Sequence, residues 1–143
     1  REIDRYFDDP ENYVFNEDEF AELCKVSHRP YTTGFYFGKT DSDSQVYTSS
    51  SYIRDYDLIA IVDGYDAETG VATVSQRNRF FNGETVEIIR PHKPYFTQRI
   101  KFMQDENDCD IDVAPHAQMT VKIKTDEPVN PGDMLRRERV QPN

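Results

Sequence analysis

The chain has 143 residues, of which 36% are hydrophobic and 13% aromatic, and its formal net charge is -10 at pH 7. One soluble folded domain fits this length, and the aromatic content is too high for a chain that is disordered throughout. The negative charge argues against a general nucleic-acid-binding protein, because phosphate contacts require a positive surface, and no apolar run approaches the roughly 20 residues of a membrane-spanning helix.

The cysteine content indicates the compartment. Cys24 and Cys109 are the two cysteines of the chain and lie far apart in the sequence. A small secreted domain held by disulfides usually has more cysteines, so we expect two free thiols in a reducing compartment and a cytoplasmic protein with no membrane partner. The absence of a CxxC pair argues against a zinc ribbon or an iron–sulfur site, and we expect no cofactor in this chain.

The first part of the chain differs in pattern from the rest and is expected to contain a short helix. Asn16 is a favourable N-cap residue for a helix over 17–25, and the acidic residues of the first turn favour the helix dipole. Phe20 and Leu23 fall on one apolar face of that helix. This face requires a covering surface, either the domain that follows or another part of a larger protein.

From residue 32 to residue 143 the pattern is that of strands. Apolar and polar residues alternate in short segments that are separated by turn residues, which is typical of a small antiparallel β-barrel. Residues 57–77 indicate a β-hairpin across a turn cluster, and residues 136–143 are expected to be a frayed end. The expected strand segments are 33–38, 57–63, 71–77, 84–89, 95–103 and 118–124.

Five stretches of the sequence resemble one known family. The most specific is the run Val-Ala-Pro-His-Ala-Gln-Met over residues 113–119. Over residues 12–138 the chain resembles the C-terminal region of the collagenase-like peptidase U32 family. The stretches that carry the resemblance are 34–38, 49–57, 70–78, 111–119 and 131–136.

A second resemblance concerns the fold. Residues 81–89 and 129–135 are similar to turns in the second, barrel domain of translation elongation factors. In each turn a glycine, Gly83 or Gly132, supplies the positive φ that a tight turn at the start of a strand requires. The resemblance therefore implies a barrel like that elongation-factor domain.

Resemblance to the U32 family implies a partner that these residues do not contain, namely a larger N-terminal catalytic domain to which residues 1–31 connect the barrel. It also implies two parent activities, proteolysis of collagen or gelatin and hydroxylation of tRNA or ribosomal RNA. We therefore expect a non-catalytic accessory domain that binds or positions a protein substrate. Two alternatives stay open: a module that binds structured RNA in a tRNA or rRNA hydroxylation protein, and a structural domain for packing or homo-oligomerisation.

The residues of this chain do not identify a catalytic site of its own. The serines at 49–51, His116 and Asp112 supply the residue types of a nucleophilic triad, but the GxSxG motif that presents a nucleophilic serine is missing. We interpret the serines as a loop. His116, next to the bend that Pro115 imposes, is either a structural histidine or a ligand contact.

Basic and aromatic residues are the candidates for substrate binding. Arginines and lysines occur in pairs two residues apart, so that both members of a pair face the same side of a strand. Converging pairs form a groove for phosphate or for an acidic polypeptide, with tyrosines as stacking surfaces; the alternative is the ordinary solvated face of a barrel. The pairs are Arg77 and Arg79, Arg99 and Lys101, and Lys122 and Lys124. The tyrosines are Tyr36, Tyr47, Tyr52, Tyr56 and Tyr65. The residues expected to contact the substrate are Tyr52, Arg54, Arg77, Arg79, His116 and Gln118.

Metal ligands are sparse in the sequence. The three histidines, His28, His92 and His116, are scattered without a metal-binding spacing. The acidic run over residues 105–112 offers oxygen ligands to calcium but lacks the glycine and terminal glutamate of an EF-hand loop, and a solvated acidic turn is the alternative. The calcium candidates are Asp108, Asp110 and Asp112.

Overall fold

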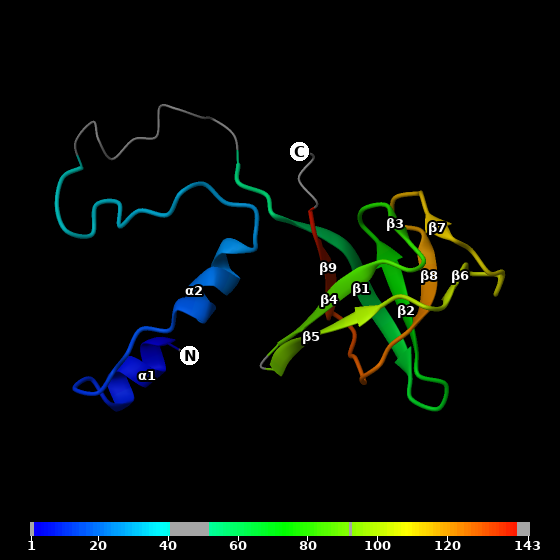
Figure 1. Cartoon of the computed structure of the whole chain (residues 1–143), viewed down its shortest axis with the longest axis horizontal. Coiled ribbons are helices and arrows are strands. Elements are labelled where there is room, and N and C mark those ends of the chain that lie inside the picture. Colours follow the sequence, from blue (N-terminus) through cyan, green and yellow to red (C-terminus); the bar gives the residue numbers. More distant parts are fainter. Residues whose placement is uncertain (1, 41–51, 92, 140–143) are drawn as a thin grey trace. The chain divides into compact units, whose positions relative to one another are not determined.

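The computed structural model describes most of the chain, whose course is shown in Figure 1. Interpretations that the sequence suggested for Tyr47, for the serines at 49–51 and for His92 fall outside the described residues. The described residues are 2–40, 52–91 and 93–139.

The chain divides into two compact units, residues 1–55 and residues 56–143. The first unit holds the helices, and the second holds all the strands of the described residues. The domain boundary that the sequence places between residues 31 and 32 stays a prediction.

The first unit contains two short helices, α1 (Glu2–Asp8) and α2 (Glu17–Cys24). Asn16 caps α2 as predicted: its side-chain Oδ1 accepts hydrogen bonds from the backbone N–H groups of Asp18 (3.0 Å) and Glu19 (3.4 Å). These bonds satisfy donors that have no partner inside the helix. Within the described part of the chain, no helix has the length and apolar character needed to cross a membrane.

The strand predicted over residues 33–38 is wrong. Two successive turns occupy this segment, in which the N–H of Tyr36 donates to the carbonyl of Thr33 (3.1 Å) and that of Gly38 to the carbonyl of Phe35 (3.2 Å). Gly38 has a φ of 134°, which side-chain-bearing residues rarely adopt. The aromatic residues that suggested a strand are exposed, because strand-forming residues make a strand only where a second strand supplies hydrogen-bond partners.

The second unit is an all-β structure whose strand pairs are all antiparallel, as predicted (Figure 1). Its main sheet has seven strands in the order β5-β4-β9-β1-β2-β8-β6, and β3 pairs with β7 in a separate two-stranded ribbon. The hairpin predicted over residues 57–77 is present as β1 and β2. The strands are β1 (Tyr56–Asp66), β2 (Val71–Gln76), β3 (Phe80–Phe81), β4 (Thr85–Arg90), β5 (Lys93–Arg99), β6 (Met103–Gln104), β7 (Val113–Ala114), β8 (Thr120–Lys124) and β9 (Met134–Glu138).

The hairpin turn between β1 and β2 is held by Asp66. Its carboxylate accepts hydrogen bonds from the hydroxyl of Thr69 (2.6 Å) and from the N–H of Glu68 (2.9 Å). These bonds favour the charged form and lower the pKa of Asp66 below its usual value. Gly70 ends the turn with a φ of 73°, in the left-handed region that glycine adopts without strain.

The two edges of the seven-stranded sheet come from one segment of the chain. Only residues 100–102 separate β5, which pairs with β4, from β6, which pairs with β8. The buried side chain of Gln98 bridges the gap: Nε2 donates to the carbonyl of Lys124 and Oε1 accepts from the N–H of Asp126, both at 2.9 Å. The sheet therefore curves into a small barrel. Among the described residues β5 and β6 form no ladder with each other, and the bend at residues 100–102 and the buried amide of Gln98 connect these two edges.

Alternate side chains of these strands fill the barrel interior. Ala72 and Val74 of β2 are buried between partly exposed neighbours, and so are Val121 and Ile123 of β8. Burying one such valine or isoleucine contributes about 1.5–3 kcal/mol, so the core supplies the main force that holds the sheet closed. The buried hydrophobic residues are Ile59, Ala60, Val62, Ala72, Val74, Phe80, Val86, Ile88, Ile100, Met103, Ala114, Val121, Ile123, Val129 and Leu135.

The frayed end predicted from residue 136 onward is wrong for residues 136–138, which belong to β9. Arg136 is 5% exposed. Its guanidinium Nη2 lies 2.6 Å from Oε2 of Glu87, and its Cζ lies 5.0 Å and 5.2 Å from the ring centroids of Tyr56 and Tyr95. One charged side chain thus joins β9 to β1, β4 and β5 by an ion pair and two cation–π contacts.

The Arg136→Ala variant is expected to lower the free energy of unfolding by about 3–5 kcal/mol, because it leaves the carboxylate of Glu87 without its buried partner. Arg139→Ala is the matched control. The side chain of Arg139 is 42% exposed and pairs with Asp57, so its loss is expected to cost at most about 1 kcal/mol. Urea denaturation followed by circular dichroism measures both variants, and equal losses contradict the role given to Arg136.

Candidate nucleic-acid interface

In the second unit, the connection from β2 to β3 and the connection from β7 to β8 are joined to each other at two points. At one end Gln76, the last residue of β2, donates its N–H to the carbonyl of Met119 and accepts a hydrogen bond from the N–H of Gln118, both at 2.9 Å. At the other end Phe80 pairs with Ala114 in the β3–β7 ribbon. The connection from β2 to β3 therefore runs antiparallel to the first part of the connection from β7 to β8.

We call residues 77–79 and 115–118 the loop pair. Two amide side chains fix it to the barrel. The side chain of Gln76 is buried and its Nε2 donates to the backbone carbonyl of Ala114 (3.1 Å). The Nδ2 of Asn78 donates to a backbone carbonyl of β1 at 2.6 Å. The backbone of the loop pair is thus anchored, while its other side chains point into solvent.

Arg77 and Arg79 are the exposed cations of the loop pair. The N–H of Arg77 donates to the carbonyl of Ile59 (2.7 Å), which holds the backbone of this connection against β1. Among the residues that the structure describes, neither arginine side chain lies within ion-pair distance of a carboxylate. Their charges are therefore available to an anionic ligand.

His116 and Gln118 lie on the other half of the loop pair and are exposed. The N–H of Met119 donates to the carbonyl of His116 (3.1 Å), which closes a tight turn. Gln118 has a φ of 62°, in the left-handed region. This turn brings His116 and Gln118 next to the arginine-bearing connection, although the two segments are far apart in the sequence.

The loop pair thus gathers four of the six residues predicted to bind substrate. The other two, Tyr52 and Arg54, belong to the first unit. The guanidinium of Arg29 lies 5.0 Å from the ring centroid of Tyr52, and Nε of Arg54 donates to Oγ of Ser27 (3.2 Å). Substrate binding by all six residues stays a prediction.

The acidic run does not form a cluster of carboxylates. Asp108 is ion-paired with Lys122, and Asp110 accepts a hydrogen bond from Nε2 of Gln104 (2.9 Å). Asp112 follows in the loop before β7. Within the described ranges, no group of three or more His, Cys, Asp or Glu side chains is arranged to hold a metal ion.

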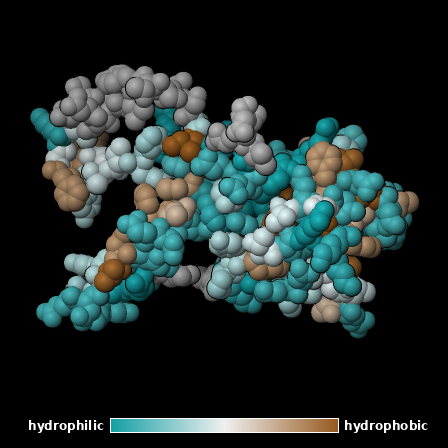
Figure 2. Space-filling view, viewed as in Figure 1, coloured by the Kyte–Doolittle hydropathy of each residue, from teal (hydrophilic) through white to brown (hydrophobic). Residues whose placement is uncertain are grey.

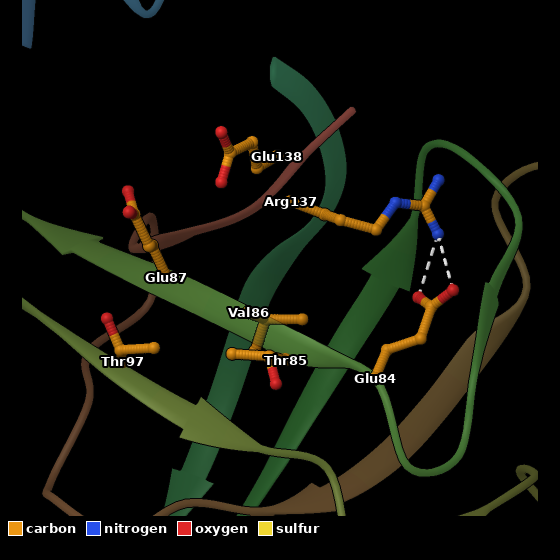
Figure 3. A pocket seen from close by; sticks show the side chains of 7 residues that line it. All are labelled: Glu84, Thr85, Val86, Glu87, Thr97, Arg137 and Glu138. Carbon is orange, nitrogen blue, oxygen red and sulfur yellow. Dashed lines mark hydrogen bonds and ion pairs between the residues drawn. The ribbon is translucent and has the colours of Figure 1, made fainter. Parts of the chain in front are cut away.

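A hollow of about 400 Å³ on the outer face of β4, β5 and β9 has the opposite polarity to the loop pair (Figure 3). Glu84, Glu87 and Glu138 line it together with Arg137. Nη1 of Arg137 donates to both carboxylate oxygens of Glu84, at 2.8 and 2.7 Å. Sequence reasoning missed this arrangement, because only the register of β4 against β9 brings the two segments together. Its carboxylates repel phosphate.

Comparison with known proteins identifies the family. Residues 54–136 match the family model described as the peptidase family U32 C-terminal domain. The chain therefore belongs to this family, as the motifs of the sequence indicated.

Two solved structures of one relative have a similar fold. Two crystal structures of the C-terminal domain of a protein described as a U32 peptidase from Geobacillus thermoleovorans are similar to this chain, each with a TM-score of 0.55. The first, a selenomethionine variant, is 42% identical and covers 57% of this chain and 99% of that chain. The second is 40% identical and covers 59% of this chain and 93% of that chain.

A curated relative extends the similarity to the first unit. The tRNA hydroxylation protein P1 of Bacillus subtilis (strain 168) is 34% identical over 135 residues, which are 94% of this chain and 32% of the relative. The chain thus spans about a third of the length of that relative.

The Gln76→Ala variant is expected to lower the free energy of unfolding by about 1–3 kcal/mol, because it leaves the buried carbonyl of Ala114 without its donor. Amide hydrogen exchange in residues 116–118 is expected to become faster in the same variant. Gln104→Ala is the control, because its amide bonds to Asp110 at the surface. If residues 116–118 keep their protection in Gln76→Ala, the side-chain amide of Gln76 does not position the loop pair.

Proposed function

We propose that this chain is a non-catalytic accessory domain of a larger U32-family protein and that its loop pair contacts the RNA substrate of a tRNA hydroxylation reaction. In this proposal Arg77 and Arg79 bind phosphate groups, while His116 and Gln118 offer hydrogen bonds beside them. The remainder of the larger protein performs the chemistry.

The exposed arginines of the loop pair, for which the described residues supply no carboxylate partner, carry this proposal. A guanidinium that no carboxylate neutralises binds phosphate by charge-assisted hydrogen bonds. Most other arginines of the second unit are engaged inside it: Arg136 pairs with Glu87, and Arg137 with Glu84. The tRNA hydroxylation protein of B. subtilis, which aligns with 94% of this chain, supports the choice of RNA as the ligand.

Binding of a protein substrate such as gelatin is the competing function. The U32 family name supports it, and so does the net charge of -10, which disfavours RNA at long range. Phosphate binding at the loop pair requires only a local excess of positive charge, and the loop pair has one. The experiment below therefore includes both ligands.

The first test measures fluorescence anisotropy of labelled tRNA and of a labelled gelatin peptide with the chain at several salt concentrations. The unchanged chain is expected to bind tRNA with an affinity that falls as salt rises. The double variant Arg77→Ala/Arg79→Ala is expected to reduce the slope of log affinity against log salt by about two, because two phosphate contacts are lost.

The matched control removes two exposed lysines from other strands, in the double variant Lys93→Ala/Lys124→Ala, and is expected to bind tRNA with a nearly unchanged slope. Equal effects of the two double variants contradict a specific role of the loop pair. Binding to gelatin with none to tRNA overturns the RNA proposal and supports recruitment of a protein substrate.

For the first unit we propose a packing function. Figure 2 shows hydrophobic side chains at the surface of this unit among hydrophilic ones. Phe20 is 41% exposed and Leu23 is 61% exposed, and together with Ile3 and Phe15 they line an apolar hollow of about 570 Å³. An apolar surface of this kind marks a contact with another protein surface, and we assign that contact to the remainder of the larger protein.

The packing proposal is tested by mixing the chain with the separately purified remainder of its parent protein. Leu23→Asp is expected to abolish co-elution in size-exclusion chromatography, because it places a charge in the apolar hollow. Leu58→Asp is the control, since Leu58 is also an exposed leucine, at 37%, but lies in β1. Co-elution of both variants contradicts the proposal.

A further inference from the structure

A further hollow of the second unit, of about 360 Å³, lies where the β3–β4 turn meets the bend between β5 and β6. Backbone hydrogen bonds hold these segments together: the N–H of Gly83 donates to the carbonyl of Ile100, and the N–H of Ile100 to that of Glu84, both at 2.8 Å. The N–H of Asn82 donates to the carbonyl of Asp112 (2.9 Å). These backbone hydrogen bonds thus hold the walls of the hollow in place.

Two cations line this hollow. Arg99 and Lys101 are exposed on either side of the buried Ile100. Nε of Arg99 donates to the carbonyl of Gly83 (2.7 Å), so the guanidinium is held in place. Gly83 has a φ of 88°, in the left-handed region that glycine adopts without strain. Lys101 forms no ion pair within the described residues. Two cations in one hollow suit a phosphate group.

An exposed aromatic residue precedes the hollow in the chain. Phe81 precedes Asn82 in the chain and pairs with Val113 in the β3–β7 ribbon. Its neighbour Phe80 is fully buried, whereas Phe81 is 42% exposed, because successive side chains of a strand point to opposite faces. Unpaired bases stack on exposed rings while cations bind their phosphates, and Phe81 offers such a ring one residue before the lining residue Asn82.

Asp112 places a carboxylate in the same hollow. A carboxylate opposes phosphate, so the hollow is not built for a phosphate ion alone. A carboxylate is an acceptor for a hydroxyl group, and the ribose 2′-hydroxyl is the donor that distinguishes RNA from DNA. Cations, carboxylate and ring together match the three parts of a ribonucleotide.

We infer that this hollow binds one unpaired ribonucleotide of an RNA, with the base on Phe81, the phosphate on Arg99 and Lys101, and the 2′-hydroxyl on Asp112. The inference rests on the proposed function and deepens it. It assigns to this chain the recognition of a loop or single-stranded segment, while the loop pair contacts the backbone without sequence preference.

The test uses the whole chain and three fluorescein-labelled probes: an RNA hairpin with an unpaired loop, the same hairpin made of DNA, and a blunt RNA duplex. Phe81→Ala is expected to weaken binding of the RNA hairpin roughly tenfold and to leave the duplex nearly unchanged. Phe81→Tyr is expected to restore hairpin binding, because a tyrosine ring also stacks. Circular dichroism establishes that each variant is folded.

The cations and the carboxylate have separate readouts. Lys101→Ala is expected to lower the salt slope for the RNA hairpin by about one contact, whereas Lys93→Ala, on the same segment but at the start of β5, is expected to leave the slope unchanged. Asp112→Ala is expected to remove the preference for the RNA hairpin over the DNA hairpin, since it deletes the acceptor of the 2′-hydroxyl.

The outcomes separate this inference from the proposed function. Salt-dependent RNA binding that requires Arg77 and Arg79 but is unchanged in Phe81→Ala and Lys101→Ala overturns the ribonucleotide site and leaves the proposed function in place. A chain that binds none of the three RNA and DNA probes overturns both. Equal binding of RNA and DNA hairpins by the unchanged chain overturns the assignment of Asp112.

Discussion

One segment of the chain, residues 93–104, has to serve both edges of the main sheet, and much of the second unit follows from this constraint. The segment pairs with β4 through β5 and with β8 through β6, so it bends between them. The bend buries Ile100 in the core and leaves Arg99 and Lys101 outside on either side of it. The hollow lined by these cations lies at this bend.

The same architecture explains how an acidic protein presents positive charge. Where strands lie side by side, their register brings arginines and carboxylates together, as for Arg136 with Glu87 and Arg137 with Glu84. Among the described residues, the loop pair and the bend have no such cross-strand carboxylate, and the cations there are exposed. The sign of the charge at these places therefore differs from the sign of the net charge of -10. At close range a ligand responds to the local charge.

The elements that could be predicted from the sequence are those with a local cause. Alternation of apolar residues indicated the hairpin over residues 57–77, and Asn16 indicated the start of α2. Two expectations failed because their outcome depends on distant partners. Residues 33–38 have strand-forming residues but no partner strand in the structure. Arg136 belongs to β9 because Glu87 and two tyrosine rings compensate its burial.

The family and the all-β class could be predicted from the sequence alone, because local motifs and alternation indicate them. Which residues lie close together depends on the tertiary structure. Arg77 and His116 share the loop pair because Gln76 and Phe80 fix the register of two segments that are distant in the chain. Alternation specifies which face of a strand is buried, but strand order and closure specify its neighbours.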